Sequence, residues 1–207
     1  NDKNLTHTEK YILEAIKNGY SFGEICILCR GNKHGIEIAK YLTGKGIPVV
    51  SSESLLLMNN SAVNVLVQFL EYFKNRSNII CAAAVINYLC KDKRLIIEEQ
   101  RLISSLTKGK TLFEVLSELG IEFKNLDSLN IFDLCTESIN KLKLIHGNEN
   151  YIRFFMDEVH EFMVQQNSGL MEFLEWWEHR KSHASLIIPE ETDAVKIMTV
   201  HKSKGLE

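Results

Sequence analysis

Residues 24–50 (EICILCRGNKHGIEIAKYLTGKGIPVV) alternate between two kinds of pattern. The run from Ile25 to Cys29 is apolar at every position, which is typical of a strand that is covered on both faces. Segment 34–43 then repeats its apolar residues with helical spacing, and segment 44–52 predicts a second short strand. Because a predicted helix at 8–18 precedes them, this order indicates a parallel α/β unit with right-handed crossovers.

The pattern changes at about residue 54. Seven segments with helical periodicity follow one another, separated by short polar breaks, and no convincing strand interrupts them. After Pro189 the chain returns to an extended pattern, DAVKIMTV at 193–200. We therefore expect an α/β fold with a large all-α insertion. Its expected parts are an α/β segment at 1–53, a helical insertion at 54–189 and a returning α/β segment at 190–207.

Composition narrows the class of protein. The chain has 207 residues, of which 45% are hydrophobic and 25% charged, as in ordinary soluble globular proteins. Its net charge of −3 means that any contact with DNA must come from a local patch. No stretch reaches the roughly 18 apolar residues of a membrane span. We expect a cytoplasmic protein without membrane contacts.

Cys26 and Cys29 form a C-x-x-C pair, which could be a metal or redox site. Strand residues three apart point to opposite faces, so this spacing favours two structural cysteines over a ligand pair. The remaining cysteines also lie in apolar runs, as expected of a protein from a reducing compartment. The histidines at 160, 179 and 183 lack a matching set of ligands, and we expect no metal site.

Aromatic residues of the helical segments permit two interpretations. They could be platforms on which nucleic-acid bases stack, or they could pack in the core. Their helical spacing favours core packing. The residues concerned are Phe154, Phe155, Phe162, Phe173, Trp176 and Trp177.

The sequence Gly109-Lys110-Thr111 matches the end of a phosphate-binding P-loop. A P-loop needs a further glycine five residues before Gly109, where this chain has Ser104, and it needs a strand leading in. The preceding residues are helical in pattern, so we expect a turn with a helix N-cap at Thr111. No other Walker-type loop occurs in the sequence.

Two segments carry candidate binding residues. Arg30 ends the first predicted strand, at the edge where α/β sheets bind ligands, and its guanidinium suits phosphate oxygens. The alternative is a solvated arginine at a strand end, and this alternative is favoured when Arg30 is considered by itself.

Residues 196–207 (KIMTVHKSKGLE) place hydrogen-bond donors, positive charge and a glycine after a strand, a chemistry that can follow a nucleic-acid backbone. An exposed basic turn is the equally weighted alternative. The donors are Thr199, His201 and Ser203, the positive charges belong to Lys202 and Lys204, and the glycine is Gly205. The acidic Glu207 would not favour phosphate and would serve another partner, such as a sugar hydroxyl.

These segments carry a family resemblance. TVHKSKGLE at 199–207 closely resembles motif V (T-x-H-x-x-K-G-L-E) of UvrD/Rep-type superfamily 1 DNA helicases, and residues 24–49 resemble their motif IV. The two motifs occur in the right order, with a helical insertion between them. SSESLLL at 51–57 looks more like the RecB/AddA-type helicase–exonucleases than like UvrD itself.

The resemblance implies a partial RecA-like 2A domain that is interrupted by a helical 2B-like domain. It implies that Arg30 contacts the γ-phosphate of Mg-ATP, which a first motor domain outside this chain mainly holds. Gly205 and Glu207 would belong to the nucleotide side. The expected contacts to single-stranded DNA are Thr199, His201, Lys202, Ser203 and Lys204.

We therefore expect a fragment of an ATP-dependent DNA helicase, or helicase–exonuclease, that acts in recombination and repair on single-stranded and duplex DNA. The P-loop, the acidic Mg-binding motif and the motif VI arginine do not occur in this sequence. Alone, the chain is expected to bind no ATP or Mg and to be inactive. A second subunit of a helicase–nuclease complex is a further candidate partner. The alternative is a non-catalytic α-helical module that binds protein or DNA, with α/β flanks as scaffolding.

Overall fold

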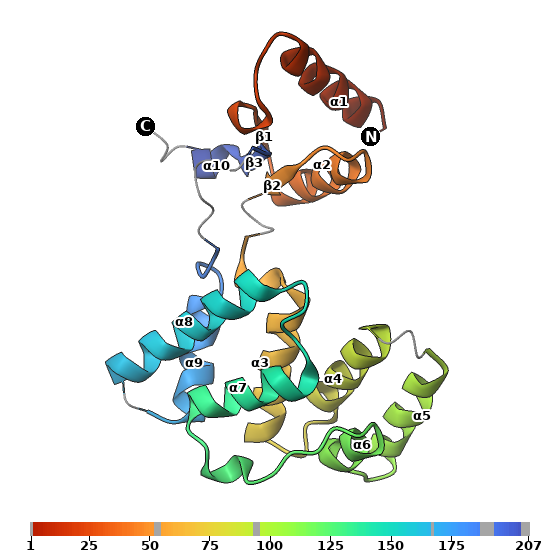
Figure 1. Cartoon of the computed structure of the whole chain (residues 1–207), viewed down its shortest axis with the longest axis vertical. Helices are drawn as coiled ribbons and strands as arrows, with labels where there is room; N and C mark the ends of the chain where they lie inside the picture. Colours follow the sequence, from red (N-terminus) through yellow and green to blue (C-terminus); the bar gives the residue numbers. More distant parts are fainter. Residues whose placement is uncertain (1, 52–54, 93–95, 167, 187–192, 204–207) are drawn as a thin grey trace. The chain divides into compact units, whose positions relative to one another are not determined.

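A computed structural model of the chain describes residues 2–51, 55–92, 96–166, 168–186 and 193–203. The chain forms two compact units, which are considered separately below (Figure 1). The α/β unit consists of residues 1–56 and 187–207, and the helical unit consists of residues 57–186. Among the described helices, none combines the length and the apolar character that a bilayer crossing requires.

The α/β unit contains a three-stranded parallel sheet in the order β1-β3-β2. The strand that follows the helical segments therefore lies between the two strands that precede them, which confirms the predicted parallel α/β arrangement. Backbone bonds fix it there, because the Val195 N–H donates to the Pro48 carbonyl and the Lys196 N–H donates to the Ile25 carbonyl, both at 2.9 Å. The elements are α1 (Asp2–Lys17), η1 (Phe22–Glu24), β1 (Cys26–Cys29), α2 (Asn32–Gly44), β2 (Val49–Ser51), β3 (Val195–Thr199) and α10 (Val200–Ser203).

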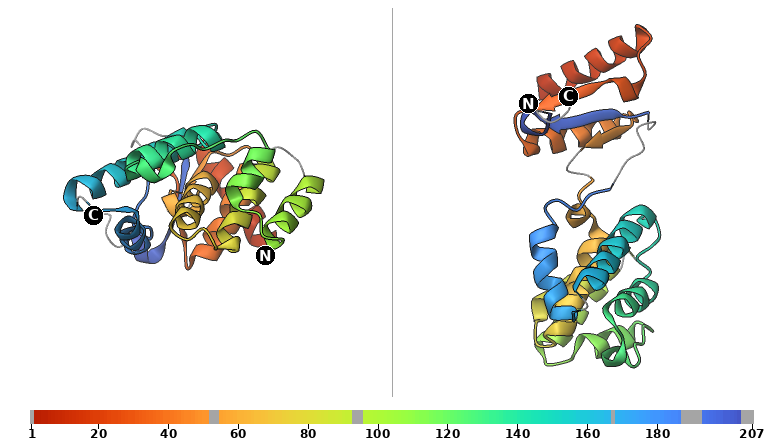
Figure 2. Two further views of the ribbon diagram at one scale, coloured as in Figure 1. Left: turned by 90° about the horizontal axis from the view of Figure 1, so that it is seen from below. Right: turned by 90° about the vertical axis from the view of Figure 1, so that its left-hand side faces the viewer.

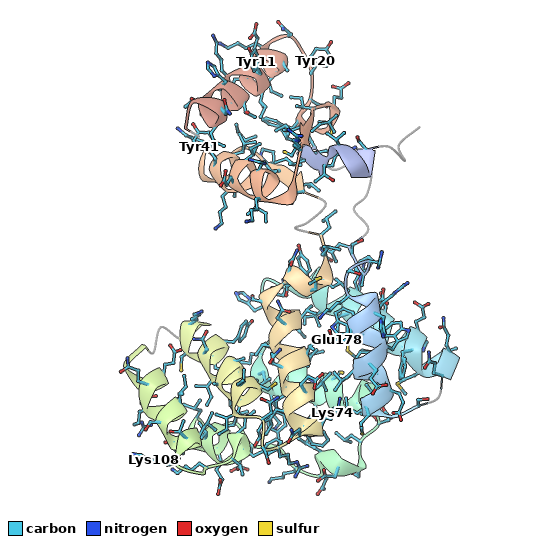
Figure 3. All side chains as sticks on the ribbon, turned by 180° about the vertical axis from the view of Figure 1, so that it is seen from behind. Tyr11, Tyr20, Tyr41, Lys74, Lys108 and Glu178 are labelled. Carbon is cyan, nitrogen blue, oxygen red and sulfur yellow. The ribbon has the colours of Figure 1, made fainter. Side chains whose placement is uncertain are left out.

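One face of this sheet carries the core of the unit. Ile27 pairs with Ile197 and Val49 pairs with Val195, so their side chains share a face and form one apolar row. The inner sides of α1 and α2 pack on this row. Figure 1 shows both helices on the same side of the strands. They are also joined to each other, since the hydroxyl of Tyr41, labelled in Figure 3, donates to Glu9 Oε2 at 2.6 Å.

The opposite face of the sheet is exposed. Cys26, Leu28 and Lys196 point to this face, and Leu28 is 55% accessible to solvent. The prediction that the first strand is covered on both faces is therefore wrong for the described residues, because both helices that precede β2 pack on the same side (Figure 2, right). Cys26 is exposed whereas Cys29 is buried, which confirms that the two cysteines point in opposite directions.

In the helical unit, α3 is the central element and contacts α4, α7, α8 and α9. Its N-terminus is capped by Asn60, whose Oδ1 accepts from the N–H groups of Ala62 and Val63. The predicted helical segments are confirmed as helices. The elements are η2 (Leu57–Asn59), α3 (Ser61–Lys74), α4 (Ile79–Asp92), α5 (Ile96–Thr107), α6 (Leu112–Glu118), η3 (Leu126–Ser128), α7 (Ile131–Leu142), α8 (Glu149–Gln166) and α9 (Leu170–Arg180).

Aromatic rings join α8 to α9. Phe155 lies edge-on to Trp177, with ring centroids 5.0 Å apart, and Phe162 lies edge-on to Phe173 at 5.4 Å. All four side chains are buried, and Trp176 packs against Phe173 from a half-buried position. This arrangement confirms the core-packing interpretation. Buried rings cannot serve as platforms for bases while the unit is folded.

The predicted turn before Thr111 is also confirmed. Gly109 has a φ of +99°, a conformation that favours glycine, and it ends the turn after α5, next to Lys108 in Figure 3. The Thr111 side chain accepts from the Glu114 N–H, and the Thr111 N–H donates to Glu114 Oε2 at 2.7 Å. These reciprocal bonds form a capping box at the start of α6. The residues that resemble a P-loop thus have a structural role.

A buried hydrogen bond at the start of α6 yields a prediction about stability. The Leu112 N–H donates to the hydroxyl of Tyr72 at 2.9 Å, and both residues are buried. Tyr72→Phe removes the acceptor and leaves this N–H without a partner, which should lower the free energy of unfolding by about 1–3 kcal/mol. Urea denaturation followed by tryptophan fluorescence measures this change. Ser117→Ala, which removes an exposed hydroxyl from the same helix, is the control; an equal shift for both variants would contradict the assignment.

Candidate functional site

Arg30 lies at the carboxyl edge of the parallel sheet. It follows the last residue of β1, and its side chain is exposed. In parallel α/β sheets this edge is where ligands bind, because loops diverge there and helices begin. The helix α2 begins two residues later, at Asn32. The backbone that carries this permanently charged guanidinium thus lies between the end of a strand and the start of a helix.

Thr199 lies at the same edge. It is the last residue of β3, and its backbone pairs in register with Cys29, the residue before Arg30. Two segments that are far apart in the sequence are therefore brought together by the central position of β3. Thr199 is partly exposed, and it lies at the edge that also carries Arg30.

The segment after β3 forms a helical turn instead of an open loop. Helix α10 begins at Val200, directly after the strand, and includes Ser203, whose hydroxyl donates to the Val200 carbonyl at 2.9 Å. The backbone of His201 and Lys202 belongs to this turn, whereas their side chains lie outside the described set. Lys204, Gly205 and Glu207 lie outside the described residues altogether, so their predicted roles stay predictions.

The C-x-x-C pair does not form a ligand site in the described structure. Burial raises the pKa of the Cys29 thiol above its ordinary value, and the nearby Cys26 raises it further. Cys29 is therefore a protonated, buried thiol at neutral pH, which is a poor nucleophile and a poor metal ligand. Within the described ranges, no three side chains from the set histidine, cysteine, aspartate and glutamate gather closely enough to hold a metal ion.

One residue at this edge is not among the sequence-based candidates. Gly35 lies in the first turns of α2 and is buried against β3. A Cβ atom at this position would lie 3.4 Å from Ile197 Cγ2. The available signal was a glycine inside a helical pattern, which costs roughly 1 kcal/mol relative to alanine and so points to a packing constraint.

Part of the α/β unit, including the edge that carries Arg30, is similar to known proteins. Residues 1–93 match the family model of the UvrD-like helicase C-terminal domain. The matched region contains β1, Arg30, α2 and β2, and it continues through α3 and α4. The UvrD-like match supports the resemblance drawn from motif IV. It does not extend to the motif V-like segment at 199–207.

The chain is also similar to a curated protein from Mycoplasma capricolum subsp. capricolum that is named a probable DNA helicase II homolog. The two sequences are 22% identical over 235 aligned positions, which cover 98% of this chain. The chain spans about a third (32%) of the length of that relative. Both comparisons therefore relate the chain to DNA helicases, and the family model relates residues 1–93 to the UvrD-like kind. Neither distinguishes the RecB/AddA type from other helicases of this kind.

Proposed function

We propose that this chain forms part of an ATP-dependent DNA helicase and supplies one edge of its motor. The observation that carries the proposal is the register of the sheet. Cys29 of β1 pairs with Thr199 of β3, so the motif IV-like arginine and the motif V-like segment lie at one carboxyl edge. A non-catalytic module would not need these two segments to meet.

In this proposal Arg30 acts on nucleotide. Its guanidinium would donate to the γ-phosphate oxygens of Mg-ATP held by another motor domain, and it would stabilise the charge that develops during phosphoryl transfer. Thr199 and the donors of α10 would contact the sugar–phosphate backbone of single-stranded DNA. In this proposal, a displacement at one ligand would reach the other through the paired backbones of β1 and β3, which are neighbours in the sheet.

The α/β unit is assigned here to the 2A domain and the helical unit to a 2B-like domain. The helical unit is one stretch of the sequence that lies between β2 and β3, and this position supports the assignment. The SSESLLL stretch at 51–57 favours a RecB/AddA-type helicase–exonuclease that acts in recombination and repair. The unpaired cysteines fit a cytoplasmic protein, and a second subunit of a helicase–nuclease complex is a candidate partner. ATP-dependent release of nucleotides from linear duplex DNA by the intact protein would test that narrower assignment.

The test of the proposal itself is ATP hydrolysis by the intact protein with and without single-stranded DNA, together with strand separation of a tailed duplex. Stimulation by DNA and ATP-dependent separation are the expected results. Binding of a protein or DNA without any ATP turnover would instead support the alternative of a helical interaction module.

The basic residues after β3 yield a prediction about DNA affinity. Lys202→Ala/Lys204→Ala removes two positive charges, so about two fewer counterions are released when single-stranded DNA binds. The slope of log K against log salt should become shallower by roughly 1.4, since each lost phosphate contact contributes about 0.7. Fluorescence anisotropy at several salt concentrations measures the slope. The control is Lys10→Ala/Lys17→Ala, which removes two exposed lysines of α1; equal slopes for both double variants would contradict the predicted contacts.

A further inference from the structure

At Gly35, α2 packs directly against the sheet. A Cβ atom built there would lie 3.4 Å from Ile197 Cγ2 and 4.0 Å from Cys29 Sγ. These are ordinary contact distances, so the space accepts one methyl group. Because Gly35 is buried, a longer side chain would have to displace its neighbours. Gly31 and Gly44, at the two ends of the same helix, have no heavy atom within 4 Å of the corresponding position. Of these three glycines, Gly35 alone meets the sheet.

The two atoms that face Gly35 belong to the two strands that carry the candidate site. Cys29 directly precedes Arg30 at the end of β1, and Ile197 lies on β3 two residues before Thr199. The contact at Gly35 is therefore one of those that set the distance of α2 from the sheet, and it involves both strands at once. Because α2 begins at Asn32, any outward shift of its first turns passes through Gly31 to Arg30.

We propose that Gly35 is a positioning residue for the motor edge: its missing side chain seats the start of α2 on β3 and thereby fixes the place of Arg30. This inference rests on the proposed function, because it assumes that Arg30 acts on ATP. A group that stabilises a transition state must be placed closely, and an error of about 1 Å can lower the rate by roughly a hundredfold. A side chain larger than alanine at position 35 moves α2 away from the sheet and Arg30 with it.

The experiment compares Gly35→Leu, Gly35→Ala and Gly44→Leu in the intact protein, using DNA-stimulated ATP hydrolysis per mole of folded protein. For Gly35→Leu we expect kcat to fall by about ten- to a hundredfold while KM for ATP stays within about twofold, because an interaction made in the transition state is lost. Gly35→Ala is the conservative replacement that fits the space, and Gly44→Leu is the matched control in open space. Both should keep kcat within about twofold of the wild type.

A second measurement tests the contact without any assay of activity. Ile197→Ala removes the methyl group that faces Gly35, so it should make room for a larger residue there. In a double-mutant cycle, Gly35→Leu should shift the midpoint of thermal unfolding less in the Ile197→Ala background than in the wild type. Gly35→Val replaces Gly35→Leu in both measurements if the leucine variant does not fold.

The outcomes separate this inference from the proposed function. If Arg30→Ala lowers kcat but Gly35→Leu does not, or if Gly44→Leu lowers it equally, the positioning role is wrong. Additive unfolding shifts in the double-mutant cycle would also overturn it, because they would mean that positions 35 and 197 do not interact. If Arg30→Ala itself leaves kcat unchanged, the proposed function fails, whatever the result at Gly35.

Discussion

Arg30→Ala is expected to lower kcat for DNA-stimulated ATP hydrolysis by the intact protein by at least about a hundredfold, since arginine fingers contribute about 10³–10⁵ in kcat. Arg30 is exposed at the carboxyl edge, so alanine removes a charged fork from the site without opening a cavity in the core. The effect should fall on kcat more than on KM, because the charge that the guanidinium stabilises develops during transfer. Steady-state kinetics over a range of ATP concentrations separates the two constants.

Two further variants sharpen this prediction. Arg30→Lys keeps the charge but loses the planar pair of donors, so its kcat should lie between those of the wild type and Arg30→Ala. Lys40→Ala removes an exposed cation from α2 and should leave kcat unchanged. The affinity of Arg30→Ala for single-stranded DNA should stay within about threefold, since one lost charge at a neighbouring site has a small effect. Unchanged ATP turnover would show that Arg30 has another role.

Phe155→Ala is expected to lower the free energy of unfolding of the helical unit by about 3–5 kcal/mol. Phe155 is fully buried on α8 and contacts the rings of Phe173 and Trp177, both on α9. Alanine leaves a cavity between these two helices and removes two edge-to-face ring contacts. The loss is a large share of the 5–15 kcal/mol that typically stabilises a domain.

The probe for this measurement is built into the chain. Its two tryptophans, Trp176 and Trp177, both belong to the helical unit, so their fluorescence during urea denaturation follows that unit and not the α/β unit. Val164→Ala is the matched control, because Val164 lies on the same helix as Phe155 and is 71% exposed. Its midpoint should hardly move. A shift as large as that of Phe155→Ala would mean that α8 does not bury the face described above.

The sequence pattern was sufficient for much of the fold. Apolar spacing located α2 to within two residues at its start and one at its end, and the capping residue Thr111 marked the start of α6. Helical periodicity also favoured the buried positions of Phe155 and Trp177. These features are local, since they depend on side chains within one or two turns of each other.

Other features depend on contacts between distant segments and were not predicted. An apolar run indicates that a strand can be buried, but not which of its faces a helix covers, so the exposure of Leu28 was missed. Helix α10 was also not predicted, because its four residues are too few to show helical periodicity. A glycine inside a helical pattern could have indicated a packing constraint at position 35, but its partner Ile197, on the other side of the helical unit in the sequence, is identified only by the fold.

The central position of β3 also orders events at the ribosome. Among the strands that the structure describes, β1 and β2 each pair with β3 and not with each other, and β3 is made after the helical unit. Synthesis of that unit, roughly 130 residues, takes on the order of ten seconds at usual elongation rates. During that interval, the backbone N–H and C=O groups of β1 and β2 have no partner strand. The helical unit can already fold, because its residues are continuous in the sequence. The sheet of the α/β unit is therefore completed after the helical unit has been made, and its two early strands are exposed to chaperones and aggregation until then.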